Sequence, residues 1–276
     1  MEAAIGFQLS AVGYESFSLS VLSCSVRGSS IADINSTVFG TEYLPMATSI
    51  SPEMRSHWTT NPVGGGWISL VEFLVGSAIV IGHNVYHVIP NEVPILFVIG
   101  WISIRLRDGG WKNIGLKRPE SWPKAILIAL VAAAVRIVGS DLVAEPLARL
   151  IWPHAVEVSP LTEAVHWKQA LQWLGIVWTF AAFGEEMSYR GYLLTRAADL
   201  GGRSGVAYWA AVLVVSVLFG FGHFYKGPTG VVDSGFAGLV LGAAYLVSRR
   251  NLWACILAHG FIDTFGLIAV LMGWAG

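Results

Sequence analysis

The sequence predicts an all-α fold, a polytopic bundle of transmembrane helices with about seven spans. Three observations support this fold class. Hydrophobic residues make up 54% of the 276 residues and charged residues only 13%, whereas a soluble globular protein carries about 25% charged residues. Apolar runs of the length of a membrane span recur along the chain. Lys and Arg gather in some of the connecting segments and are nearly absent from others.

The first 65 residues differ from the rest of the chain. They are rich in Ser and Thr, and they contain no long apolar run. The mildly apolar stretch 11–26 lacks the preceding basic segment that a signal peptide would have. We therefore expect residues 1–65 to be a poorly ordered N-terminal region and residues 66–276 to form the transmembrane helical domain.

The expected spans are apolar stretches that end at proline, glycine or charged residues. The first is expected to extend to about residue 87, and the fourth is far longer than a bilayer requires. In order, the spans are expected at residues 67–81, 93–104, 124–152, 167–200, 206–224, 234–248 and 252–274. The segments that separate them are 89–91, 105–123, 153–166, 201–205, 226–228 and 249–250.

The distribution of Lys and Arg predicts the orientation of the spans. These residues crowd segments 105–124, 190–203 and 249–250, and they are nearly absent from segments 82–92 and 153–166. The positive-inside rule places the first group in the cytoplasm and leaves the carboxyl terminus outside. We expect an integral protein of the lipid bilayer, in the plasma membrane of a prokaryote.

A charged cluster lies within the fourth expected span, where Glu185, Glu186 and Arg190 follow an apolar run. Each ionised group in lipid costs about 2.5–3.5 kcal/mol on insertion scales, so the cluster is either a solvated helix end or part of a cavity with a function. On a helix, Glu186 and Arg190 can pair because they are four residues apart. Glu185 points about 100° away around the axis. A carboxylate without a local cation in a low-dielectric cavity is suited to act as a general base.

Two further polar motifs lie in the later spans. His223 ends the fifth span, one turn after Phe219, and the two side chains share a helix face. His259 and Asp263 are four residues apart in the seventh span and face one way. Taken separately, His223 is typical of an interfacial histidine, and the other pair is typical of a hydrogen bond that holds helices together.

Together these side chains form a set that could bind a metal ion or activate a water molecule. Zinc accepts histidine nitrogens and carboxylate oxygens, and catalytic zinc sites keep one position open for water. The H-E-x-x-H helix of soluble zinc proteases is absent from the sequence. The candidate ligands of a Zn²⁺ ion are Glu185, His223, His259 and Asp263.

The three motifs resemble those of the CPBP family, which comprises CAAX proteases and bacteriocin-processing enzymes and is also called the Abi family. The family pattern E-E-x-x-x-R, F-x-x-x-H, H-x-x-x-[N/D] is met in order by residues 185–190, 219–223 and 259–263. The similarity covers about residues 110–270. It implies an intramembrane endopeptidase that acts on a peptide or a membrane-anchored protein.

The resemblance also implies a role for each residue. Glu185 would activate water, and His223 would help to hold that water or a metal ion. Glu186 and Arg190 would orient the site. The histidine–aspartate pair of the last span would stabilise the tetrahedral oxyanion or complete the metal set. The resemblance leaves open whether the enzyme depends on zinc or acts through glutamate-activated water alone.

Three other functions compete with this interpretation. The segment Gly202–Gly205 matches the G-x-S-G motif of rhomboid-type serine proteases, but Ser204 lies in a polar loop beside Arg203. A non-enzymatic immunity or scaffold protein would use the polar residues for helix packing or partner binding. A transporter would use intramembrane carboxylates in a proton relay. The net charge of −1 gives no electrostatic case for nucleic-acid binding, and nothing indicates an oligomeric state.

The remaining charged residues have less specific interpretations. Arg136, Asp141 and Glu145 in the third span are expected to pair with one another or with the core, and Glu72 in the first span has no evident partner. A further pair, His83 and His87, is four residues apart and could ligate a metal ion, but it is more typical of a wet helix end.

The expected topology contains one conflict. Simple alternation of the spans puts His223 near the outer face, whereas Glu185 and His259 fall nearer the cytoplasmic side. The three can meet only if helices tilt, break or enter a cavity. Gly184 and Gly191 in the long fourth span would allow such a break.

Overall fold

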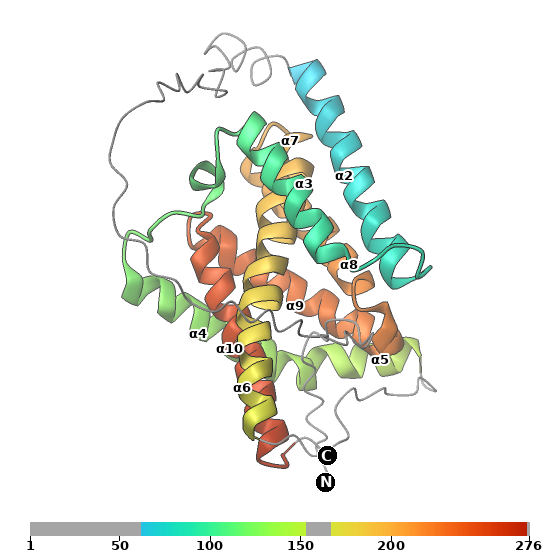
Figure 1. Cartoon of the computed structure of the whole chain (residues 1–276), viewed down its shortest axis with the longest axis vertical. Coiled ribbons are helices and arrows are strands. Elements are labelled where there is room, and N and C mark those ends of the chain that lie inside the picture. The colour runs from blue at the N-terminus through green and yellow to red at the C-terminus, as the bar shows by residue number, and fades with distance from the viewer. Residues whose placement is uncertain (1–61, 153–166, 275–276) are drawn as a thin grey trace, which may run out of the picture.

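The computed structural model describes residues 62–152 and 167–274 (Figure 1). Within these residues all regular structure is helical and no strand occurs, which confirms the all-α prediction. By length and composition, four helical stretches of the described chain could cross a membrane, and a shorter apolar helix accompanies them. The protein is therefore an integral membrane protein. The expected N-terminal region 1–65 lies outside the described residues, except for its last four, with which the first helix begins.

Helices α2 (Pro62–Asn84) and α3 (Glu92–Arg107) correspond to the first two expected spans. The loop between them ends at Asn91, whose side chain accepts a hydrogen bond from the backbone N–H of Val93 at 2.9 Å. This contact caps α3 at its first turn. A short 3₁₀ turn, η1 (Trp111–Ile114), follows α3.

The third expected span is one helical stretch with a wide turn in its middle. It consists of α4 (Trp122–Gly139), the π-helical turn η2 (Ser140–Ala144) and α5 (Glu145–Ile151). Pro146 lies in the first turn of α5, one residue beyond the wide turn. Because proline has no backbone N–H and its ring clashes with the carbonyl one turn earlier, a regular α-helix cannot continue through it. The wide turn accommodates this proline while the helix goes on.

The fourth expected span is the central element of the fold. It comprises α6 (Trp167–Ile176), two π-helical segments, η3 (Val177–Glu185) and η4 (Met187–Leu193), and α7 (Leu194–Asp199). This central segment packs against α2, α3, α8 and α10. In a π-helix each N–H bonds to the carbonyl five residues earlier, and such wide turns are frequent at functional sites.

The glycines of the central segment do not break it, contrary to the expectation for Gly184 and Gly191. A Cβ atom added to Gly184 would lie 3.1 Å from Val93, and one added to Gly191 would lie 2.6 Å from the ring of Trp111. Both glycines therefore serve close packing of α3 and η1 against the central segment.

Three helices complete the fold: α8 (Gly205–Phe221), α9 (Gly227–Val247) and α10 (Leu252–Leu271). The sequence places the start of the sixth span at residue 234, but α9 begins earlier, at Gly227. Pro228 lies in its first turn, where no N–H is required, and so it starts the helix rather than ending the preceding one.

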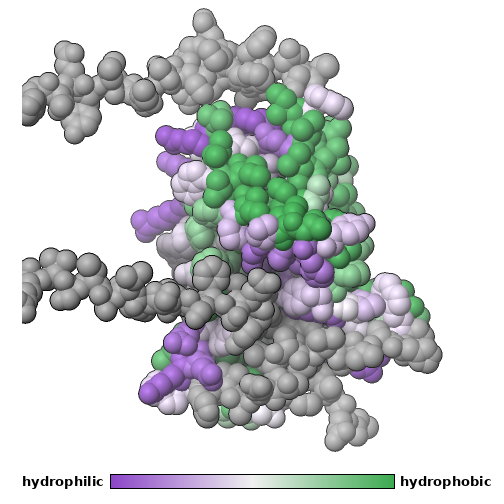
Figure 2. Space-filling view, turned by 45° about the vertical axis from the view of Figure 1, so that its right-hand side comes forward, coloured by the Kyte–Doolittle hydropathy of each residue, from purple (hydrophilic) through white to green (hydrophobic). Residues whose placement is uncertain are grey.

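Many large apolar side chains on the outer faces of the helices are exposed. Figure 2 shows them as a broad green area on one face of the molecule, beside purple polar patches. Exposed apolar surface of this extent is unusual for a soluble protein. It is the surface that a bilayer covers, in agreement with the long apolar helices.

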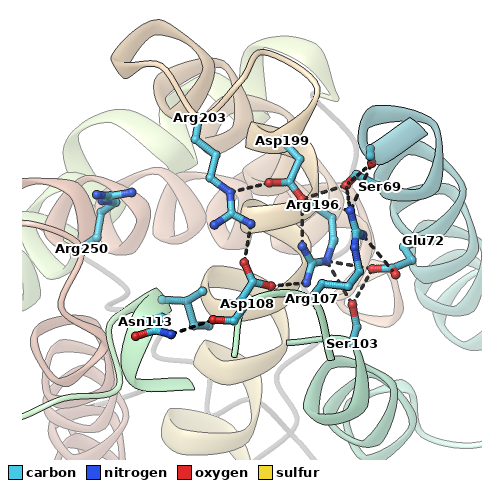
Figure 3. Close-up of polar contacts among 12 residues, drawn as sticks. Ser69, Glu72, Ser103, Arg107, Asp108, Asn113, Arg196, Asp199, Arg203 and Arg250 are labelled. Carbon is cyan, nitrogen blue, oxygen red and sulfur yellow. Dashed lines mark hydrogen bonds and ion pairs between the residues drawn. The ribbon is translucent and has the colours of Figure 1, made fainter. Parts of the chain in front are cut away.

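A network of buried ion pairs holds α2, α3 and α7 together (Figure 3). The guanidinium of Arg196 is fully buried and lies 2.8 Å from Glu72, 2.5 Å from Asp108 and 2.8 Å from Asp199. Glu72 also pairs with Arg107 at 3.2 Å. Glu72, which has no evident partner in the sequence, is therefore a shared carboxylate between two arginines.

The connecting loop after α7 extends this network. Arg203 pairs with Asp199 and, at 2.5 Å, with Asp108. Burial alone would lower the pKa of Arg203, but the hydrogen bond that it donates to Asp199 and the charges of both carboxylates raise the pKa above its usual range. The turn after α9 lies at the same end, because the N–H of Leu252 donates to the carbonyl of Gly115 at 3.0 Å. The three Lys/Arg-rich segments of the sequence thus gather at one end of the bundle, and its cytoplasmic location stays a prediction.

Candidate active site

The carboxylate of Glu186 is the centre of a buried polar cluster. Its Oε1 accepts a hydrogen bond from Nη1 of Arg190 at 2.8 Å, and Nδ1 of His259 lies 2.8 Å from the same oxygen. Glu186 is completely buried and Arg190 is 1% exposed. The pairing expected from their spacing in the sequence is therefore present, and it joins the central segment to α10.

His259 lies between two carboxylates. Its Nδ1 faces Glu186, and its Nε2 lies 3.5 Å from Oδ2 of Asp263, an ion-pair distance rather than a short hydrogen bond. All three side chains are buried. Both ring nitrogens of His259 are therefore directed at carboxylates of the protein itself.

The ring of Phe219 brings the end of α8 into this cluster. It packs 4.5 Å from Cζ of Arg190, 4.8 Å from the ring of His223 and 6.3 Å from the ring of His259. Nδ1 of His223 lies 2.9 Å from the backbone carbonyl of Phe219. Because a carbonyl oxygen only accepts, this nitrogen carries the hydrogen. The shared face expected for the two residues is present.

Glu185 points away from the Glu186–Arg190 pair, as its place in the helix predicts. It is 8% exposed, and its Oε2 has no hydrogen-bond partner among the described residues. It interacts electrostatically with His259, Asp263 and Glu92. A buried carboxylate oxygen without a partner is costly, so it is a position at which a water molecule or a substrate group would be stabilised.

The site residues meet around the central segment, although simple alternation of the spans places His223 near one membrane face and Glu185 and His259 near the other. The end of this segment, near Arg196, belongs to the ionic network together with the carboxyl end of α3. Glu185 lies earlier in the segment and interacts with Glu92, which begins α3. The expectation that Glu185 and His259 lie nearer the cytoplasmic side stays a prediction.

The third expected span contributes a buried ion pair to the neighbourhood of the site. Nη2 of Arg136 lies 2.5 Å from Oδ2 of Asp233, and Ser140 donates to Oδ1 of the same carboxylate. Asp141 is exposed, and Glu145 lies 3.4 Å from Arg149. Arg136 therefore pairs with the core, the second of the two expected alternatives, because α9 starts early enough to place Asp233 on a helix that packs against α4.

The loop before α3 holds a further polar contact. Nε2 of His83, in the last turn of α2, lies 3.3 Å from the buried carboxylate of Glu92, the first residue of α3. His87 is exposed in the turn after α2, so the two histidines do not share a helix face. Their use as a metal pair has no support in this arrangement.

The four candidate zinc ligands do not form a ligand group in this arrangement. Among the residues that the structure describes, no three His, Cys, Asp or Glu side chains are placed to hold a metal ion. The ring nitrogens of His259 both face carboxylates. Zinc dependence stays a prediction, and no step of the chemistry below is assigned to a metal.

Several residues around the site could not be identified from sequence motifs. Glu92, Tyr189, Lys226 and Asp233 are buried near the six predicted residues. A signal was present only for Lys226, as a charged residue directly after an apolar run; the sequence pattern alone is equally typical of a solvated helix end.

Ser204 has a structural role in this arrangement. Its hydroxyl accepts a hydrogen bond from the backbone N–H of Ala207 at 3.2 Å and so caps α8. Ser204 is exposed and lies beside Arg203 in the ionic network, apart from the buried cluster around Glu186. Its geometry gives the rhomboid-type interpretation no support.

Gly260 directly follows His259, and a Cβ atom added there would lie 2.5 Å from two ring atoms of Trp178. We expect Gly260→Ala to lower the free energy of unfolding by about 1–3 kcal/mol, because the rigid indole cannot yield without moving α10. Gly175→Ala is the matched control, since nothing lies within 4 Å of its added Cβ. Thermal unfolding in detergent compares the two variants. Equal melting temperatures would contradict the close packing at Gly260.

Comparison with known protein families gives a match in the second half of the chain. Residues 167–265 match the family model described as Type II CAAX prenyl endopeptidase Rce1-like. The match begins with α6 and ends within α10, so it contains all six predicted site residues. No curated protein and no solved structure matches the chain.

Proposed function

We propose that the chain is a membrane protease of the CPBP family, because residues 167–265 match the Rce1-like family model. From this premise we propose that it is an endopeptidase in which Glu185 activates a water molecule inside the helical bundle. The observation that carries the proposal is the buried Oε2 of Glu185, which has no partner among the described residues and lies beside the Glu186–Arg190–His259 cluster.

The proposed reaction is hydrolysis of a peptide bond. Water adds its oxygen to the carbonyl carbon while Glu185 takes one of its protons, and the carbonyl electron pair becomes an oxyanion. Collapse of this intermediate breaks the C–N bond, and the proton held by Glu185 passes to the departing nitrogen. Glu186 and Arg190 position His259, and His223 lies on the same side of the site through its contact with Phe219.

Two observations support a substrate class: the description of the matching family and the location of the site among apolar helices. The family description concerns prenylated proteins with a carboxyl-terminal CAAX sequence. A site among apolar helices is suited to a peptide that reaches it from the bilayer, so we propose a membrane-anchored protein or a lipidated peptide as substrate. We further propose the plasma membrane of a prokaryote as its location.

Cleavage of a panel of peptides by purified, detergent-solubilised protein tests the proposal. The panel should contain prenylated and unprenylated peptides, each offered to the wild type, Glu185→Gln and Ser204→Ala. We expect Glu185→Gln to lose about 10²–10⁴-fold in kcat, the usual share of a general base, and Ser204→Ala to keep its activity. Each assay is repeated with a chelator and after addition of Zn²⁺, which tests the metal separately.

Two outcomes would decide against this function. Cleavage that survives Glu185→Gln would show that another group activates the water. If the wild type cleaves no peptide in the panel, the non-enzymatic interpretation gains support, in which the buried polar residues hold helices together or bind a partner.

A further inference from the structure

A hollow opens where α4 and α10 begin, at the Lys/Arg-rich end of the bundle. Its volume is about 70 Å³, enough for several water molecules or for one small anionic group. It lies between the loop that precedes α4 and the turn that joins α9 to α10, two segments that are far apart in the sequence. None of the six predicted site residues lines it. The hollow is therefore separate from the candidate active site.

The lining of the hollow carries a surplus of positive charge. Its charged residues are Lys117, Arg118, Glu120, Lys124 and Arg249. Glu120 and Arg249 neutralise each other, because Nη1 of Arg249 lies 3.1 Å from the carboxylate. The two lysines and Arg118 are exposed and form no ion pair with any other residue that the structure describes. Three cations therefore remain available to an anion in the hollow.

Hydrogen bonds fix the backbone around these cations. Nδ2 of Asn251 donates to the carbonyl of Lys117 at 3.1 Å, which ties the loop before α4 to the start of α10. The side chain of Asn251 also caps α10, since its Oδ1 accepts from the N–H of Trp253 at 3.0 Å. Ser121 caps α4 in the same way, by accepting from the N–H of Lys124 at 3.4 Å. The basic side chains thus extend from a fixed frame, and the positive ends of two helix dipoles add to their charge.

The surroundings of the hollow indicate that the anion belongs to a lipid. The indole rings of Trp122 and Trp253, in the first turns of α4 and α10, lie with their centroids 6.0 Å apart. Tryptophan is enriched at the level of the lipid headgroups. Beyond Trp122, α4 carries a group of exposed apolar side chains: Ile126, Leu127, Leu130 and Val131. A phospholipid whose phosphate enters the hollow would lay its acyl chains against these side chains, whereas a free phosphate ion would leave them uncovered.

We propose that the hollow is a binding site for the headgroup of an anionic phospholipid, whose phosphate lies between Lys117, Arg118 and Lys124. Basic pockets between transmembrane helices are suited to such headgroups because several cations converge there. A zwitterionic phospholipid would bind less well, since its headgroup brings a cation of its own toward the three basic side chains. The anionic lipid would hold the start of α10 against α4, about two turns before His259. It would therefore stabilise the folded bundle.

Native mass spectrometry of the full-length protein in detergent tests the site directly, with an equimolar mixture of phosphatidylglycerol and phosphatidylcholine. We expect the wild type to retain phosphatidylglycerol in preference. The double variant Arg118→Gln with Lys124→Gln should bind phosphatidylglycerol about 30-fold more weakly, the usual contribution of two cations near an anionic lipid. The matched control is Arg105→Gln with Lys112→Gln, which removes one exposed arginine and one exposed lysine from the same end of the bundle but outside the hollow. It should bind the lipid like the wild type.

Thermal unfolding with added ligand distinguishes a lipid from a free phosphate ion. Phosphatidylglycerol should raise the melting temperature of the wild type and of the control, and that of Arg118→Gln with Lys124→Gln much less, because a ligand stabilises the state that binds it. Without lipid all three proteins should melt alike, since substitutions of exposed side chains change stability little. Inorganic phosphate at the same concentration should have little effect. If it stabilises the wild type as much as phosphatidylglycerol does, the ligand is a free ion and the lipid proposal is overturned.

Three further results would overturn the site. Equal retention of the two lipids by the wild type would show that no anionic headgroup is selected. An unchanged affinity in Arg118→Gln with Lys124→Gln would show that these cations do not bind the lipid. Equal losses in both double variants would assign the attraction to the overall charge of this end rather than to the hollow. None of these measurements depends on peptide cleavage, so the lipid site and the proposed peptidase function are tested independently.

Discussion

An Arg196→Met protein is expected to lose about 3–5 kcal/mol of unfolding free energy, the usual cost of removing one partner from a buried ion pair. The guanidinium of Arg196 is 0% exposed and touches Glu72, Asp108 and Asp199, which come from α2, the loop after α3 and α7. Methionine keeps much of the stem and removes the charge. The three carboxylates would then face one another with only the outer arginines to neutralise them.

Thermal unfolding in detergent, followed by tryptophan fluorescence, measures this effect. Arg249→Met is the matched control, because Arg249 and its partner Glu120 are 75% and 78% exposed and such pairs add little to stability. We expect a large fall in melting temperature for Arg196→Met and almost none for Arg249→Met. Similar melting temperatures for the two variants would show that the buried network does not stabilise the bundle.

The Glu186→Gln variant is expected to lose both stability and activity. Arg190 is 1% exposed and would keep its charge without its carboxylate partner, at a cost of about 3–5 kcal/mol. His259 would lose the ionised acceptor that lies 2.8 Å from its Nδ1, so its ring would no longer be held in one orientation. Cleavage should therefore fall strongly, even in the fraction of protein that stays folded.

The double variant Glu186→Leu with Arg190→Met separates the two effects. Replacing both partners of a buried pair by apolar residues is often neutral for stability. We expect the double variant to recover most of the melting temperature that Glu186→Gln loses, but to remain inactive because His259 is still unsupported. Recovery of cleavage in the double variant would show that the pair has no part in positioning the site.

The sequence predicts much of the fold because its signals are local. Apolar runs, Pro90 and the glycine-rich segment 201–205 place the helices within a few residues of their observed bounds, and α9 is the main exception. Pro228 shows the reason: a proline is compatible both with the end of one helix and with the first turn of the next. The wide turns at 177–193 were not predicted, because periodicity arguments assume an α-helix.

In the candidate site, contacts within one helix could be predicted from the sequence, whereas contacts between helices could not. Glu186 and Arg190 could be paired from their spacing alone, and Glu185 could be set apart from them. The partners of Glu72, Arg136 and His259 come from other helices, so no spacing along the chain reveals them. Lys226 lies directly before α9, and its stem packs where a side chain at Gly230 would lie, a contact that becomes visible only when α9 is known to begin at Gly227.

The wide turns of the central segment also constrain how its length can change. The segment joins two rigid clusters, the Glu186–Arg190–His259 site and the Arg196 network, and both depend on the direction in which its side chains point. Deleting one residue between them would rotate one cluster against the other by roughly a quarter of a turn, because a helical segment turns with every residue. Neither end can absorb that rotation without losing buried ion pairs. Insertions and deletions should therefore be excluded from residues 187–195 even at positions where substitutions are tolerated.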